Sequence, residues 1–125
     1  MHWTLYVSVT LLPLLVLILL EVRRSTSSLE ARRKGEQLLL ANLTPAQRRQ
    51  FETCRYFDAV GSATGQQYRI FEGRYQNVFE LRDGRRGQGR CFMPAGNLVA
   101  GDCMLAQKIA IENYEDEVLR TAVRF

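Results

Sequence analysis

The uncharged apolar run from Trp3 to Leu20 constrains this chain more than any other feature of its sequence. It reads WTLYVSVTLLPLLVLILL. A helix over these residues would be about 27 Å long, close to the roughly 30 Å of a hydrocarbon core. We therefore expect residues 1–22 to form a transmembrane anchor, kinked near Pro13, with Trp3 and Tyr6 at the outer interface.

Basic side chains follow the apolar run, and no Lys or Arg precedes it. Because basic residues favour the cytoplasmic side, this asymmetry predicts a single-pass protein of the inner (plasma) membrane, with its N-terminus outside and its C-terminal domain cytoplasmic. A cleaved secretory signal is disfavoured, since the apolar run is too long and lacks a basic n-region. The lipid bilayer is thus an expected partner, contacted by the membrane-surface residues Arg23, Arg24, Arg32, Arg33 and Lys34.

The rest of the chain divides into a basic juxtamembrane linker over residues 23–43, interrupted near Gly35, and a small domain over residues 44–125. Thr44, Pro45 and Gln47 form a capping box that predicts a helix ending near Arg55. Residues 56–93 alternate apolar and polar side chains between turn signals, which predicts three or four antiparallel strands. The fold class is therefore α+β: an N-terminal transmembrane helix, then a small antiparallel meander packed against helices.

The C-terminal third, from residue 100 onward, predicts helix. Asp102 is the expected N-cap of a first segment whose apolar residues recur at helical spacing. The acidic run from Glu115 to Glu117 suits the start of a second helical segment, in which Val118 and Ala122 face the core. Together with Glu112, this run is expected to be solvated rather than to bind a cation.

Several short motifs stand in a distinctive order: GSATGQQYRI, NVFEL, CFMP and GDCMLAQKIAIENYEDEVLRTA. In this order they resemble an uncharacterised small bacterial domain, with the pattern Thr-Gly, Tyr-Arg-Ile, Asn-Val, Cys-x-x-Pro and Asp-x-Met-Leu-Ala-Gln-Lys. The resemblance covers roughly residues 43–125. It implies one folded domain, and no reaction, ligand or catalytic residue.

Residues that carry chemistry are sparse. The single histidine, His2, precedes the apolar run, so a histidine-based catalytic set or zinc site inside the domain is excluded. Cys54, Cys91 and Cys103 are too far apart for a Cys-x-x-Cys motif and are expected to be small buried hydrophobic residues. A reactive Cys103 at a helix start and a three-thiolate metal site are the alternatives. We predict no catalytic residues, no cofactor, no metal site and no small-molecule substrate, and do not expect an enzyme.

The remaining function classes are binding functions. We expect a membrane-anchored protein of unknown molecular function whose cytoplasmic domain is a protein-interaction module. The alternative is a membrane-tethered nucleic-acid-binding domain, since Arg side chains near Tyr68, Tyr75 and Phe79 suit charge and stacking. Tyr68, Arg69 and Asn77 belong to the polar part of the motif pattern. The candidate interaction residues are Arg82, Arg85, Arg86, Arg90, Asp102, Gln107 and Lys108.

Overall fold

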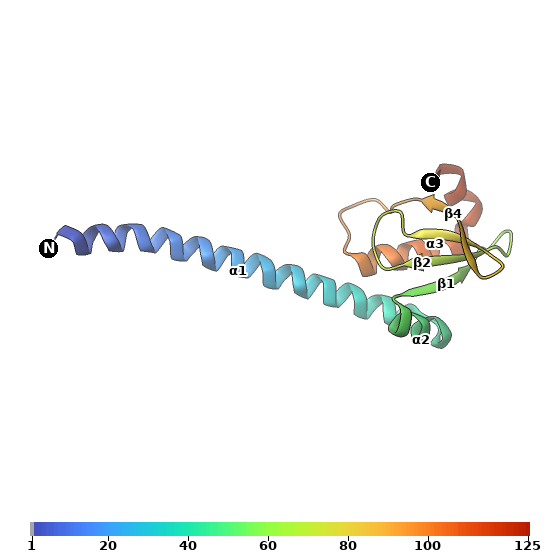
Figure 1. The fold of residues 1–125 in the computed structure, drawn as a ribbon, viewed down its shortest axis with the longest axis horizontal. Helices are drawn as coiled ribbons and strands as arrows, with labels where there is room; N and C mark the ends of the chain where they lie inside the picture. Colours follow the sequence, from blue (N-terminus) through green and yellow to red (C-terminus); the bar gives the residue numbers. More distant parts are fainter. Residues whose placement is uncertain (1) are drawn as a thin grey trace. The chain divides into compact units, whose positions relative to one another are not determined.

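The computed structural model describes residues 2–125, and describes side chains from Leu11 onward. The chain divides into two units, residues 1–33 and 34–125. In order, the described elements are α1 (His2–Asn42), α2 (Pro45–Cys54), β1 (Tyr56–Val60), β2 (Gln67–Phe71), β3 (Val78–Arg82), β4 (Arg85–Cys91), α3 (Ala100–Thr121) and β5 (Val123–Arg124). Figure 1 shows them in sequence colours.

The structure is α+β, with three helices and one five-stranded antiparallel sheet among the described residues. The strand order β1-β2-β3-β4-β5 follows the chain, because each hairpin places a strand beside the previous one. The predicted three or four strands thus become five. The additional strand is β5, which lies where a helix was predicted.

The predicted transmembrane anchor over residues 1–22 is wrong. Among the residues that the structure describes, none of the helices combines the length and the apolar composition needed to span a bilayer. α1 continues past the apolar run into Glu21, Arg23 and Arg24, whose side chains are exposed.

The localisation that followed from the anchor, a single-pass protein of the inner membrane with its N-terminus outside, is therefore also wrong. The predicted interface positions of Trp3 and Tyr6 lie outside the described side chains. The basic residues assigned to the membrane surface are exposed on α1, where Arg24 lies 3.8 Å from the Glu21 carboxylate.

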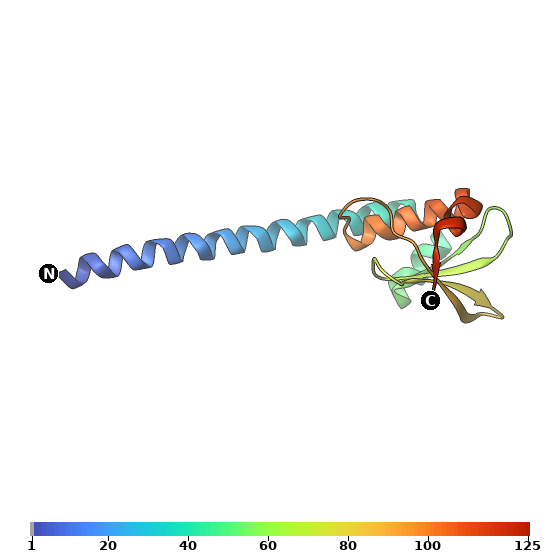
Figure 2. The ribbon, with the colours of Figure 1, turned by 90° about the horizontal axis from the view of Figure 1, so that it is seen from above.

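Helix α1 continues through Gly35, the predicted interruption, because this glycine is a packing site rather than a break. A Cβ at Gly35 would lie 2.5 Å from the Val99 side chain, and a Cβ at Gly101 would lie 2.4 Å from the Gly35 backbone. The two glycines let α3 approach the last turns of α1 closely, and Figure 2 shows the two helices side by side. Leu39 and Leu43, counted as linker from sequence, are consequently buried.

Helix α2 begins and ends as its sequence predicts. The Thr44 hydroxyl accepts from the Gln47 backbone N–H, and the Gln47 side chain accepts from the Thr44 backbone N–H. At the other end Arg55 caps the helix in the left-handed region, at φ 59°. Its guanidinium donates to Glu36 at 3.0 Å and to Glu72 at 2.7 Å. Arg55 thereby joins α1, α2 and the strand end after β2.

The core lies between the helices and one face of the sheet. Alternation along the strands directs Phe57, Ala59, Tyr68, Ile70 and Val78 to this face. There they pack against buried side chains of the three helices and of the residue that follows α1, namely Leu39, Leu43, Phe51, Met104 and Ile111. The opposite face of the sheet carries the alternate residues of the same strands, and it defines the candidate site.

Candidate functional site

Four aromatic side chains form a continuous row on the sheet face opposite the core. The rings of Tyr56 and Phe71 have centroids 5.3 Å apart, those of Phe71 and Phe79 5.6 Å, and those of Phe79 and Phe125 5.2 Å. They contact edge to face or tilted, the arrangements that the ring quadrupole favours. We call Tyr56, Phe71, Phe79 and Phe125 the aromatic row. It crosses the sheet from β1 to the segment that follows β5.

Two arginines lie over this row. The Arg86 guanidinium carbon is 4.8 Å from the Phe71 ring centroid and 4.7 Å from that of Phe79. The Arg69 guanidinium carbon is 4.1 Å from the Tyr56 ring centroid. Both separations are within the range of cation–π attraction. The aromatic row is therefore covered by positive charge.

The two arginines differ in their counter-charges. Arg69 donates to both carboxylate oxygens of Asp58, at 2.7 and 3.0 Å. Burial raises the pKa of Asp58, but the hydrogen bonds from Arg69 and Gln50 outweigh it and hold that pKa below its ordinary value of 3.8. Arg86 is exposed and has no ion pair with any carboxylate among the described residues. Arg86 is thus the cation on this face with free hydrogen-bonding capacity.

The β3–β4 hairpin brings three of the four predicted hairpin arginines to the surface. Asp83 and Gly84 both have positive φ, 53° and 73°, which forms a tight turn between the strands. Arg82, Arg85 and Arg86 flank this turn and are exposed; we call them the arginine hairpin. Of the three, Arg82 alone forms an ion pair within the described part of the chain, with Glu80 at 3.9 Å. The hairpin adjoins the aromatic row through Arg86.

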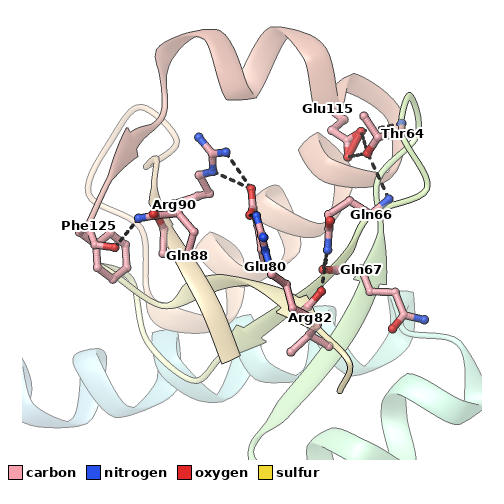
Figure 3. Close-up of polar contacts among 11 residues, drawn as sticks. Thr64, Gln66, Gln67, Glu80, Arg82, Gln88, Arg90, Glu115 and Phe125 are labelled. Carbon is pink, nitrogen blue, oxygen red and sulfur yellow. Dashed lines mark hydrogen bonds and ion pairs between the residues drawn. The ribbon is translucent and has the colours of Figure 1, made fainter. Parts of the chain in front are cut away.

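Arg90, the fourth predicted hairpin arginine, forms a nearly buried ion pair and has a structural role. Its guanidinium donates twice to one oxygen of Glu80, at 2.7 and 3.0 Å, and both side chains are almost buried. Figure 3 shows this pair, and the second carboxylate oxygen of Glu80 lies 3.9 Å from the Arg82 guanidinium. A buried pair needs such close geometry to offset the desolvation of both charges. Arg90 therefore does not belong to the exposed arginine hairpin.

The predicted residues of α3 lie elsewhere and hold the fold together. Gln107 is 1% exposed and exchanges two side-chain hydrogen bonds with Asn77, both 2.9 Å. Lys108 donates to Glu112 at 2.6 Å, one helical turn away. Asp102 lies in the first turn, and the N-cap is Val99 instead. None of the three is brought to the aromatic row.

A buried carboxylate, Glu115, was missed from sequence. It is 1% exposed and accepts from both the backbone N–H and the hydroxyl of Thr64, at 2.8 and 2.7 Å (Figure 3). Gly61 makes room for it, because a Cβ there would lie 1.5 Å from a Glu115 oxygen. Burial and the nearby Glu115 charge raise the pKa of Tyr68 well above its ordinary range. The GSATG motif is thus a loop that covers Glu115, next to Tyr114, where non-helical backbone angles interrupt α3.

The cysteines do not form a reactive or metal-binding set. Cys103 is buried, its thiol lies 3.6 Å from the Arg74 carbonyl oxygen, and burial raises its pKa. Cys54 is exposed and Cys91 half-buried, so the expectation that all three are buried is wrong for Cys54. Within the described part of the chain, no three His, Cys, Asp or Glu side chains gather as metal ligands would.

Comparison with known proteins gives no relative for this chain. No protein-family model, no curated protein and no solved structure matches it. The resemblance to an uncharacterised small bacterial domain therefore stays a prediction. The candidate site is defined by its geometry alone: an open sheet face with an aromatic row and an adjoining arginine hairpin.

Proposed function

We propose that this chain is a protein-interaction module, and that the open sheet face binds an acidic segment of a partner protein. The observation that carries the proposal is Arg86, which lies over the rings of Phe71 and Phe79 with no carboxylate partner in the described structure. A carboxylate of the bound protein would form the ion pair that Arg86 lacks, and apolar side chains beside that carboxylate would cover the rings.

The composition of the face supports a protein partner. Aromatic residues and arginine are enriched at protein interfaces and dominate their binding energy, whereas lysine is depleted. The aromatic row and the arginine hairpin contain these residue types and no lysine. The three exposed arginines outnumber Asp83, the one acidic residue in the turn. This imbalance favours a negatively charged segment by charge complementarity.

The same geometry argues against the nucleic-acid alternative. Proteins that bind single strands offer free aromatic faces on which bases stack. Here the rings of Phe71 and Phe79 contact each other edge to face, and Arg86 lies over both. Tyr68, which the nucleic-acid interpretation needed on the surface, is 1% exposed. A base would have to displace Arg86 before it could stack on Phe71 or Phe79.

The test measures fluorescence anisotropy of a labelled peptide that alternates glutamate with phenylalanine and valine, titrated with the full chain. A peptide with lysine in place of glutamate and a labelled oligouridylate are the comparison ligands. The variant Arg86→Gln keeps length and polarity and removes the charge. Arg49→Gln is the matched control, because Arg49 is exposed on α2, away from the site.

We expect the acidic peptide to bind, and the lysine peptide to bind weakly. Loss of a central arginine typically costs about 1–2 kcal/mol, so Arg86→Gln should weaken binding about tenfold and Arg49→Gln should not. Equal binding by both variants would contradict the proposal. Preferred binding of oligouridylate, with affinity that falls steeply as salt rises, would replace the protein partner by nucleic acid.

A further inference from the structure

The segment Val123–Phe125 occupies one edge of the sheet, beside the candidate site. β5 pairs antiparallel with β4, Arg124 opposite Arg90 and Val123 opposite Cys91. The ladder continues at Phe125, whose N–H donates to the Gly89 carbonyl at 3.2 Å and whose carbonyl accepts from the Gly89 N–H at 3.3 Å. The Gln88 side chain donates to the same Phe125 carbonyl at 2.7 Å, as Figure 3 shows.

The Phe125 ring packs directly on the backbone of Gly89, a position that only glycine permits. We call this contact surface, formed by Gly89 and Phe79, the seat. A Cβ on Gly89 would be 2.4 Å from the ring, so any side chain there would displace it. Edge-to-face contact with Phe79 fixes the other side of the ring. This seat receives an aromatic side chain from a strand paired with β4, and it is one end of the aromatic row.

The opposite edge of the sheet is closed to such pairing. On β1 the Asp58 backbone N–H donates to the Gln50 side chain at 2.8 Å, and its carbonyl accepts from the Gln47 side chain at 2.9 Å. The two glutamines of α2 therefore already hydrogen-bond the backbone N–H and carbonyl of Asp58, with which an added strand would have to pair. Strand addition is therefore favoured at β4.

β5 pairs with β4 through few contacts. It has two residues, Val123 is 65% exposed and Phe125 is 40% exposed. Segments with few buried contacts and exposed hydrogen bonds open at low free-energy cost. Moreover, β4 extends from Arg85 to Cys91, whereas the paired positions reach only from Gly89 to Cys91. A longer strand would continue along β4 toward Arg85.

We infer that Val123–Phe125 occupies the site on β4 at which the partner segment binds. An extended acidic segment displaces it, adds to β4 as an antiparallel strand, and places an aromatic side chain on Gly89 and its carboxylates at Arg86 and Arg85. Main-chain bonds then supply affinity and the seat supplies specificity, as in other strand-addition complexes. While β5 is bound, it competes with the partner and lowers its apparent affinity. This inference rests on the proposed function and specifies the binding mode.

The register offers a direct test. Val123 lies opposite Cys91, so the substitution Val123→Cys places two thiols at directly opposite positions of the β4–β5 pair. Opposite Cα atoms of antiparallel strands are about 4.5–5.5 Å apart, which a disulfide can bridge. Oxidation then locks β5 onto β4, and dithiothreitol unlocks it. The substitution Cys54→Ser removes the exposed thiol that would otherwise link two molecules. Binding of the glutamate, phenylalanine and valine peptide to the full chain is measured in both states.

We expect the locked chain to bind the peptide at least about tenfold more weakly than the reduced chain, which should match the Cys54→Ser parent. Replacing phenylalanine by alanine in the peptide should weaken binding to the reduced chain by a similar factor, since the seat on Gly89 is then empty. As a second measurement, hydrogen exchange of the Gly89 amide should be fast in the free chain and slow with peptide bound.

Equal binding by the locked and reduced chains would overturn strand displacement, and if Arg86→Gln still weakened binding, the proposed function would stand. No binding by the reduced chain would overturn both. Dimers that form only in the reduced state would identify β5 of a second copy as the occupant, which would also overturn the peptide proposal.

Discussion

Replacing Gln107 by leucine should destabilise the fold by about 2–4 kcal/mol. The substitution keeps the volume and removes the amide. Two side-chain bonds to Asn77, each 2.9 Å, disappear with it, as does a 3.3 Å bond to the Phe92 carbonyl. Asn77 keeps its bond to the Phe71 carbonyl, but its own oxygen loses the Gln107 donor at a site that is 5% exposed. A buried unsatisfied group costs about 1–3 kcal/mol, and the lost bonds add to this.

Equilibrium urea unfolding of the full chain, followed by circular dichroism, measures this free energy. Gln37→Leu is the control, because Gln37 is exposed on α1 and its loss should change stability by less than about 0.5 kcal/mol. The double variant Gln107→Leu with Asn77→Leu should lose about 1–2 kcal/mol less unfolding free energy than the sum of the losses in the two single variants. A Gln107→Leu chain as stable as the parent would refute the structural role and return Gln107 to the candidate interaction residues.

Three further predictions follow from buried or paired side chains. Gly61→Ala should destabilise the chain by more than about 2 kcal/mol in the same urea assay, because its Cβ would overlap the Glu115 carboxylate; a neutral result would contradict the close approach. Asp58 has a lowered pKa, so its pair with Arg69 stabilises the fold above pH 3.8, and this contribution is lost as pH falls through the folded pKa. In a plot of unfolding free energy against pH, Asp58→Asn should therefore flatten the decline at acid pH. Finally, Cys103 should react with a thiol reagent only after urea unfolding, whereas exposed Cys54 reacts at once; early labelling of Cys103 would show that it is not buried.

Local signals in the sequence predicted the local structure of the domain. The Thr44 capping box placed the start of α2, and alternation with turn signals placed β1 to β3. Apolar spacing placed the first part of α3. These predictions succeeded because each depends on residues that are neighbours in the chain. The apolar composition of the N-terminal run, by contrast, suggested a span that the described helix does not support.

The parts that sequence missed depend on contacts between distant residues. Glu115 looked like part of a solvated acidic run, and only the fold brings Thr64 over it. The Gln107–Asn77 pair joins residues 30 positions apart. β5 was read as helix because Val118 and Ala122 continue the helical spacing, whereas α3 ends at Thr121.

The aromatic row was equally hidden. Alternation places Phe71 and Phe79 on one face, but no local signal shows which face the helices cover. Arg86 was expected only as part of a charged turn, and it lies over two rings. The register between strands and the seat of Phe125 on Gly89 complete the row. The arginines of the hairpin were singled out from sequence as candidate interaction residues because they cluster around one turn.

Amide chemical-shift mapping tests the central claim most directly. The full chain, labelled with nitrogen-15, is titrated with the glutamate, phenylalanine and valine peptide. Saturable shifts should concentrate on β2 to β5, with the largest at Phe79, Arg86 and Gly89, and should disappear in the Arg86→Gln variant. Saturable shifts confined to α1 or to the exposed side of α3, unchanged by Arg86→Gln, would contradict the assignment of the open sheet face as the binding surface.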